Sequence, residues 1–195
     1  MNSVSRRGRR PGKPDTRTQI LDVARKRFLG GGYQAVTMRA VAAEAGVDLA
    51  LVSYYFGSKK GLLGAALALA VNPADILGRA AEGDTALFPQ RALRSLLRLW
   101  EDPESGAPLR ALIAGAAHDA VVANLVKEMI EVELIDLIAE RIGGANARKR
   151  AAAFCAQLAG LIVTRYILRL EPIASMRSDE LIRLYSPPLR LALRT

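Results

Sequence analysis

Few residues of this 195-residue chain are of the types that carry out catalysis or bind metals. It has one histidine, His118, and one cysteine, Cys155, so Cys/His zinc-site spacing is absent and no Ser/His/Asp or Cys/His set is evident. Phosphate-loop and paired-glycine nucleotide motifs are absent too. The reactive side chains that do recur are hydroxyl and basic groups between residues 37 and 59, which suit contacts with an anionic partner. We therefore expect no catalytic residue, no metal and no cofactor.

The positive charge is concentrated in the N-terminal third. Residues 1–64 contain 12 basic and 4 acidic residues, whereas the other 131 residues contain 16 and 15. This distribution predicts attraction to nucleic acid or to a lipid surface. Residues 1–14 are rich in Gly, Pro and Arg, which predicts a flexible arm. Its arginines either contact a minor groove or the phosphates, or serve only solubility. They are Arg6, Arg7, Arg9 and Arg10.

Short helices are the elements expected to position the hydroxyl and basic side chains. Ala, Leu and Arg dominate, and apolar residues recur every three or four positions, so the chain is predicted to be all-α. A first helix from about Asp15 is expected to stop at residues 30–32. Thr37 is expected to cap a helix over 38–45, and Asp48 one over 49–56.

The turn between these two helices carries its own signals. Gly46 suits the left-handed conformation of a tight turn, and small Ala42 lets the two helices approach closely. Val41, Val47 and Val52 can fill the wedge between them. This pattern is typical of a helix-turn-helix, whose second helix enters a major groove.

The same residues resemble a known family. The run from Thr37 to Val47 (TMRAVAAEAGV), continued by LVSYYFGSK from Leu51 to Lys59, closely resembles the DNA-binding domain of TetR-family transcriptional regulators. The resemblance extends back to Ile20 in the first helix. It implies a helix-turn-helix domain over 15–74 and a C-terminal effector-binding and dimerisation domain over 75–195, with 1–14 as the arm.

The resemblance also implies roles for single residues. Thr37, Arg39 and Lys59 would contact phosphates, which positions the domain without reading sequence. The recognition helix would present Asp48, Leu49, Ala50, Ser53, Tyr54 and Tyr55. Because residues 49–51 offer no bidentate donor, base reading would rest on the serine, the tyrosines, thymine methyl contacts and DNA shape.

The C-terminal region is predicted to be helical at 75–81, 88–101, 108–119, 120–142, 147–170 and 178–194, with a kink or restart at Pro187-Pro188. Residues 151–163 are apolar almost all round, which favours a dimer interface, with monomer core as the alternative. The interface candidates are Phe154, Leu158, Leu161, Ile162, Arg165, Leu181, Leu184, Tyr185 and Leu189. The effector-pocket candidates, each of which also suits a purely structural role, are Trp100, Arg110, His118, Met129, Gln157 and Tyr166.

Together these features predict a cytoplasmic, homodimeric bacterial transcriptional regulator. The resemblance favours a repressor that binds a near-palindromic DNA operator and is released by a small, largely hydrophobic effector. The lone cysteine suits a reducing compartment, and the most apolar stretches, 62–71 and 151–163, do not amount to a membrane span. Two alternatives stay open: an activator that also binds DNA, and a non-specific module for nucleic acid or membrane surfaces.

Overall fold

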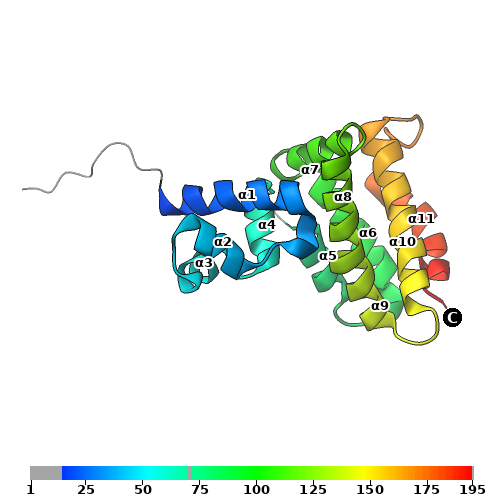
Figure 1. The fold of residues 1–195 in the computed structure, drawn as a ribbon. Helices are drawn as coiled ribbons and strands as arrows, with labels where there is room; N and C mark the ends of the chain where they lie inside the picture. Colours follow the sequence, from blue (N-terminus) through cyan, green and yellow to red (C-terminus); the bar gives the residue numbers. More distant parts are fainter. Residues whose placement is uncertain (1–14, 70–71, 195) are drawn as a thin grey trace, which may run out of the picture.

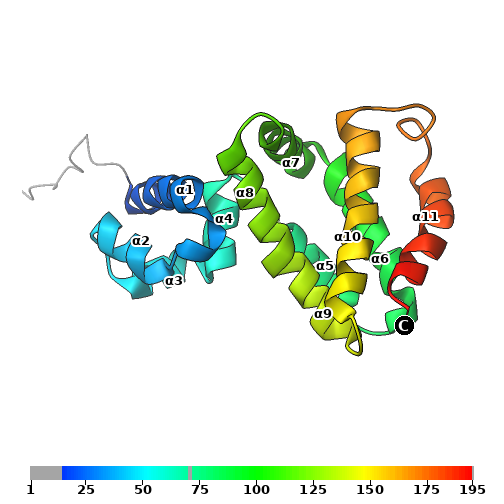
Figure 2. The ribbon, with the colours of Figure 1, turned by 45° about the vertical axis from the view of Figure 1, so that its right-hand side comes forward.

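A computed structural model describes residues 15–69 and 72–194, and these residues form helices joined by short loops, without a β-strand. Figures 1 and 2 show two groups of helices along one long axis. We call α1–α4 the head and α5–α11 the body. The all-α prediction is confirmed for the described residues.

The head contains α1 (Thr16–Ala35), α2 (Met38–Ala45), α3 (Leu49–Phe56) and α4 (Lys59–Ala66). The last three begin at side-chain caps, and those of α2 and α3 are the predicted ones. The side-chain oxygens of Thr37, Asp48 and Ser58 accept hydrogen bonds from backbone N–H groups at 3.1, 2.6 and 3.1 Å. Gly46 ends α2 with φ 65° and ψ 34°, the left-handed conformation that the turn requires.

The core of the head includes a residue of the body. Ile20, Phe28, Val41 and Val52 are fully buried, and Leu125 of helix α8 packs among them with no exposed surface. In both views α8 runs beside the head and continues into the body (Figures 1 and 2). Head and body are therefore joined by packing as well as by the chain.

The body begins with α5 (Pro73–Ala81), the short η1 (Thr85–Leu87), α6 (Phe88–Glu101) and α7 (Pro103–Ala116). A long rod follows, made of α8 (Ala120–Met129), the π-helical segment η2 (Ile130–Ile135) and α9 (Asp136–Ile142). The last elements are α10 (Ala147–Ile162), the π-helical η3 (Val163–Ile167) and α11 (Ser178–Ala192). Stacked rings of Phe88 and Phe154, with centroids 5.3 Å apart, mark the body core.

The predicted boundaries had mixed outcomes. The first helix breaks within residues 30–32 as predicted, because Gly32 has non-helical φ and ψ, and a short helical stretch then continues to Ala35. Helix α7 begins at Pro103 because Asp102 accepts the N–H of Ser105 at 2.8 Å, so the true start lies before Pro108. Helix α11 continues through both prolines to Ala192, so of the predicted kink or restart the restart is wrong.

Candidate DNA-binding surface, effector pocket and their junction

Helix α3 has one buried and one exposed side. Val52 and Phe56 pack into the head, whereas the exposed fraction of Tyr54 is 82% and that of Tyr55 is 36%. The two tyrosine rings meet edge to face with centroids 5.5 Å apart. Ala50 and Ser53 are exposed as well. The outer side of α3 thus presents two hydroxyl-bearing aromatic side chains and small residues to a partner.

The other predicted DNA-contacting residues fall into two groups. Arg39 and Thr37 are exposed, and Thr37 retains its hydroxyl hydrogen while its oxygen caps α2. Asp48 and Leu49 have structural roles within the head: the first caps α3, and the second is half-buried against the head core. The arm residues Arg6, Arg7, Arg9 and Arg10 lie outside the described residues.

Lys59 is held inside its own chain rather than extended toward solvent. Its Nζ lies 4.3 Å from the centroid of the Tyr33 ring and donates to the backbone carbonyl of Gln34 at 3.2 Å. Partial burial lowers the pKa of Lys59. A phosphate contact by this residue would require the side chain to leave the ring of Tyr33.

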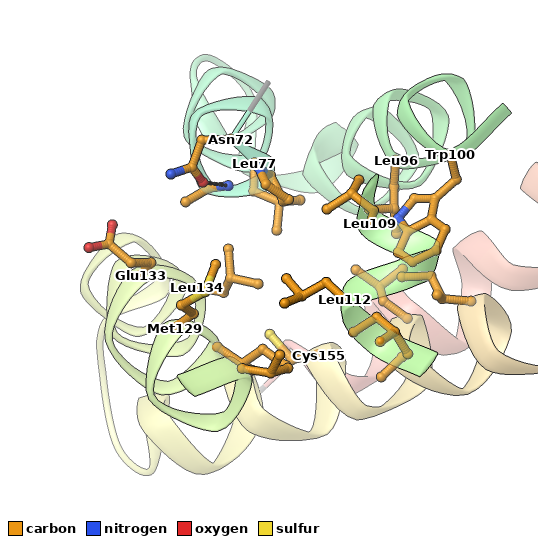
Figure 3. A pocket seen from close by; sticks show the side chains of 18 residues that line it. Asn72, Leu77, Leu96, Trp100, Leu109, Leu112, Met129, Glu133, Leu134 and Cys155 are labelled. Atoms are coloured by element: carbon orange, nitrogen blue, oxygen red, sulfur yellow. Dashed lines mark hydrogen bonds between the residues drawn. The ribbon is translucent and has the colours of Figure 1, made fainter. Parts of the chain in front are cut away.

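The body encloses an apolar cavity of about 120 Å³ between α5, α6, α7, α10 and the α8–η2 rod. Among the described residues that line it, Glu133 alone is charged. Figure 3 shows Asn72 and Glu133 at one end and Trp100 at the other, with aliphatic side chains and Cys155 between them. Burial raises the pKa of the Cys155 thiol to about 11, so at neutral pH it stays protonated.

The polar end of the cavity is also the junction with the head. Glu133 accepts a hydrogen bond from the Tyr33 hydroxyl, and its other oxygen lies 3.8 Å from Nζ of Lys60. One helical turn earlier, Glu128 accepts the backbone N–H of Gln34 at 2.8 Å. Burial and the carboxylate of Glu133 raise the pKa of Tyr33, which therefore keeps its hydroxyl proton. Two carboxylates of one rod thus hold the C-terminal end of α1.

Two family models match this chain, and together they cover most of it. One, described as tetracyclin repressor-like, C-terminal domain, matches residues 87–193. The other, described as bacterial regulatory proteins, tetR family, matches residues 20–66. This chain belongs to the TetR family.

The chain is also similar to solved structures over most of its length. A TetR-family regulator from Streptomyces coelicolor A3 shares 29% identity over 95% of this chain and 98% of its own, with a TM-score of 0.48. A protein from Mesorhizobium loti, described as a TetR-family transcriptional regulator, has a TM-score of 0.51 at 19% identity, over 91% and 95%. NalD of Pseudomonas aeruginosa, the secondary repressor of a multidrug efflux pump, shares 20% identity over 91% and 94%, with a TM-score of 0.47. A comparison with curated proteins gave no match.

The chain is thus an all-α, DNA-binding transcriptional regulator of the TetR family. Within 15–69 and 72–194, no helix is long and apolar enough to cross a membrane. The same residues contain no group of His, Cys, Asp and Glu side chains that could hold a metal ion.

Of the six residues predicted for the pocket of this TetR-family chain, two line the cavity and four do not. Trp100 and Met129 line the cavity. Tyr166 lies outside its lining, stacked on the indole with centroids 5.5 Å apart, and Arg110 donates to the backbone carbonyl of Trp100 at 2.9 Å. His118 is exposed in the loop after α7, and Gln157 is likewise outside the lining.

Sequence reasoning missed Asn72, Cys155 and Glu133 as lining residues. For Glu133 a signal was present, because it stands in the apolar run IEVELI over 130–135, where an acidic residue needs a polar partner. That partner, Tyr33, is 100 positions away in the sequence.

The interface prediction needs a correction for most of its residues. The side chains of the corrected group are at most 4% exposed in a single chain, so they belong to the body core and cannot form the surface met by a second copy. They are Phe154, Leu158, Leu161, Leu181 and Leu189. Arg165 is also occupied within the chain, where it donates to the carbonyls of Ile173 and Met176 at 2.5 and 2.8 Å.

The outward surface of the last two helices is made of other residues. On α10, Ala153, Ala156 and Gly160 are exposed. On α11, Leu184 is 55% and Leu191 68% exposed. Ile162 and Tyr185, also predicted for the interface, are half-buried against the body core.

Proposed function

We propose that this TetR-family regulator is a homodimeric repressor that binds a near-palindromic operator and is released by a small, largely hydrophobic effector. The observation that carries the proposal is the double role of helix α8. Its Leu125 is fully buried in the head core, and the next residue, Val126, lines the body cavity. A molecule that displaces this wall of the cavity also displaces a part of the head core.

The surface of α3 supports the DNA-binding half of the proposal. Tyr54 is 82% exposed, so both its apolar ring and its hydroxyl are available to a partner. Its hydroxyl can reach a phosphate, while the small side chains of Ala50 and Ser53 allow close approach to base edges.

The outward residues of α10 and α11 support the dimer. Small residues on α10 permit close packing of a second helix, and Leu184 and Leu191 add apolar area that a two-fold partner would cover. A two-fold dimer presents two copies of α3, so its operator has two related half-sites, about 34 Å or a multiple of that apart.

Selection of random duplex DNA by the purified protein tests the DNA-binding half. We expect the surviving sequences to share a motif with two-fold symmetry, and Tyr54→Ala to lose binding while it stays folded. Recovery of salt-sensitive binding without a motif would contradict the proposal and favour the non-specific alternative. Transcription from a promoter carrying the selected motif then distinguishes repression from activation.

The oligomeric state tests the dimer, with Leu184→Arg as the variant and Val121→Arg as the control. Val121 is also an exposed apolar residue, 48% exposed, but lies in the first turn of α8 rather than on α10 or α11. Sedimentation equilibrium should give a dimer for the parent and for the control, and a monomer for Leu184→Arg. A parent that is monomeric at micromolar concentration, or a variant that stays dimeric, would contradict this interface.

A further inference from the structure

We infer that the cavity takes a hydrophobic cation, and that Glu133 is the residue through which the bound cation loosens the head. This inference rests on the proposed function and names the ligand class and the coupling residue of the same site.

The charge of the cavity wall points to a cation. The lining is aliphatic and aromatic except at one end, where Glu133 lies beside Asn72 (Figure 3). An apolar ligand that covers this end would shield the carboxylate from water without offering a partner, which is unfavourable. A ligand with a positive group at that end supplies the partner, and an anionic ligand is repelled.

The counter-charge that Glu133 has within the chain is weak. The nearest ammonium, on Lys60, is 3.8 Å from the carboxylate of Glu133 but 2.6 Å from that of Asp75, so Lys60 is paired chiefly elsewhere. The other groups that face it are the neutral Tyr33 hydroxyl and the ammonium of Lys59, which interacts with Glu133 electrostatically but lies over the Tyr33 ring. Glu133 therefore retains the capacity to bind a full positive charge at close range.

The size of the cavity implies that entry moves its walls. At about 120 Å³ it is smaller than the roughly 300–1,000 Å³ of pockets for drug-sized ligands, and closer to cavities that hold a benzene-sized molecule. Glu133 lies in η2, a π-helical segment of the rod, and such segments are frequent at functional sites. A ligand larger than one ring must displace part of the lining, and the π-helical segment that carries Glu133 is one of its walls.

If the carboxylate of Glu133 moves away from the Tyr33 hydroxyl, the DNA-binding head is affected directly, because Tyr33 is part of the head core. The ring of Tyr33 stacks on Phe28, with centroids 6.0 Å apart, and supports the ammonium of Lys59 at the start of α4. The residue is 5% exposed, so its hydroxyl would be left without an acceptor in a nearly dry site. The contact of Glu128 with Gln34 does not involve the cavity and stays as a pivot.

Two probes of the same shape test the charge recognition: phenyltrimethylammonium and its neutral isostere tert-butylbenzene. Trp100, the single tryptophan of the chain, lines the cavity, so its fluorescence reports occupancy by either probe. We expect the full chain to bind the cation at least about 10-fold more tightly, because the quaternary ammonium gains Coulomb attraction to the carboxylate of Glu133 although it has no N–H to donate. No DNA is needed, so this arm can fail while the proposed function stands.

Three variants locate the effect. In Glu133→Gln the preference for the cation should fall to near unity, while unchanged binding of tert-butylbenzene shows that the cavity is intact. Glu131→Gln removes the same charge two positions away, from a residue outside the cavity lining, and should keep the full preference. Tyr33→Phe removes a competitor for the carboxylate and should bind the cation several-fold more tightly.

The coupling is tested with the duplex obtained by selection. Saturating phenyltrimethylammonium should weaken operator binding by the parent at least several-fold and leave Glu133→Gln unaffected, and the operator should weaken cation binding by the same factor. Equal affinity for both probes, no change in Trp100 fluorescence, or a preference that survives in Glu133→Gln would each overturn the inference. The inference would also be overturned if the cation bound through Glu133 and left operator affinity unchanged. A failed selection in the absence of probes would instead refute the proposed function.

Discussion

Substitution of Gly32 by alanine should be among the most damaging small changes to this protein. Gly32 has φ 78° and ψ 175°, a conformation that glycine adopts almost exclusively, and forcing another residue into it costs about 1–3 kcal/mol. The new Cβ would also lie 2.8 and 2.9 Å from the carboxylate oxygens of Glu128. That carboxylate must then move away from the N–H of Gln34, which removes a charge-assisted contact worth about 1 kcal/mol at a partly exposed site. We expect the free energy of unfolding to fall by about 2–4 kcal/mol.

Two other glycines separate the contributions. Gly30 has helical dihedral angles, and no other atom lies within 4 Å of the place that an alanine Cβ would occupy, so Gly30→Ala should raise stability by about 0.5–1 kcal/mol. Gly46 also has open space around it but φ +65°, so Gly46→Ala isolates the cost of the left-handed conformation, about 1–2 kcal/mol. Two glycines of one Gly-Gly-Gly run should therefore change stability in opposite directions.

Urea unfolding followed by far-UV circular dichroism measures all three, at one fixed protein concentration because dissociation of the proposed dimer would contribute to the midpoint. The order expected is Gly30→Ala above the parent, then Gly46→Ala, then Gly32→Ala. If Gly32→Ala were no worse than Gly46→Ala, the contact of Glu128 with the end of α1 would contribute nothing to stability. If Gly30→Ala were destabilising, the helix would not be continuous at that position.

Four further outcomes are expected. Tyr54→Ala should change the free energy of unfolding by less than about 0.5 kcal/mol, because the side chain is 82% exposed, while DNA binding measured by fluorescence anisotropy is lost. Phe154→Ala should cost about 3–5 kcal/mol in urea unfolding, since the ring is fully buried. Cys155, whose pKa burial raises to about 11, should react with iodoacetamide at pH 8 at least about 100-fold more slowly in the folded than in the unfolded chain. The N–H of Gln34 lowers the pKa of Glu128, so this carboxylate stabilises the fold at pH values above its unfolded pKa of about 4.3. The stabilisation is lost as pH falls through the lower pKa of the folded state. The dependence of unfolding on acid pH should therefore be less steep in Glu128→Gln.

The head shows how far local signals can determine structure. The bounds of α2 and α3 were predicted to the residue, because Thr37, Asp48 and Gly46 each act within four positions of the chain. Helix α7 was misplaced although the same kind of signal was present. Two prolines competed for its start, and the cap at Asp102, which decides between them, depends on a side-chain geometry that the pattern does not contain.

The cavity and the outer surface were less predictable for a different reason. An apolar helix such as α10 can be covered by its own chain or by a second copy, and periodicity does not distinguish these cases. The large side chains, Phe154 among them, turned inward, and the small ones, such as Ala156, were left outside. Trp100 and Met129 were found because large soft side chains favour cavities, whereas Glu133 depends on a contact with a distant helix.

The spacing of residues along the α8–η2 rod argues that cavity and head cannot change independently. Leu125 and Val132 pack toward the head core, while Val126 and Ile130 line the cavity, so two neighbouring sides of one rod serve two sites. A head joined to the body by a flexible linker alone would be indifferent to what the cavity holds. Here a displacement of the rod repacks the head core, and close-packed interiors respond to such shifts by moving whole elements. Glu133 lies where both sides meet, and we therefore expect a change in the partner of its carboxylate to alter the contact with Tyr33 at the end of α1.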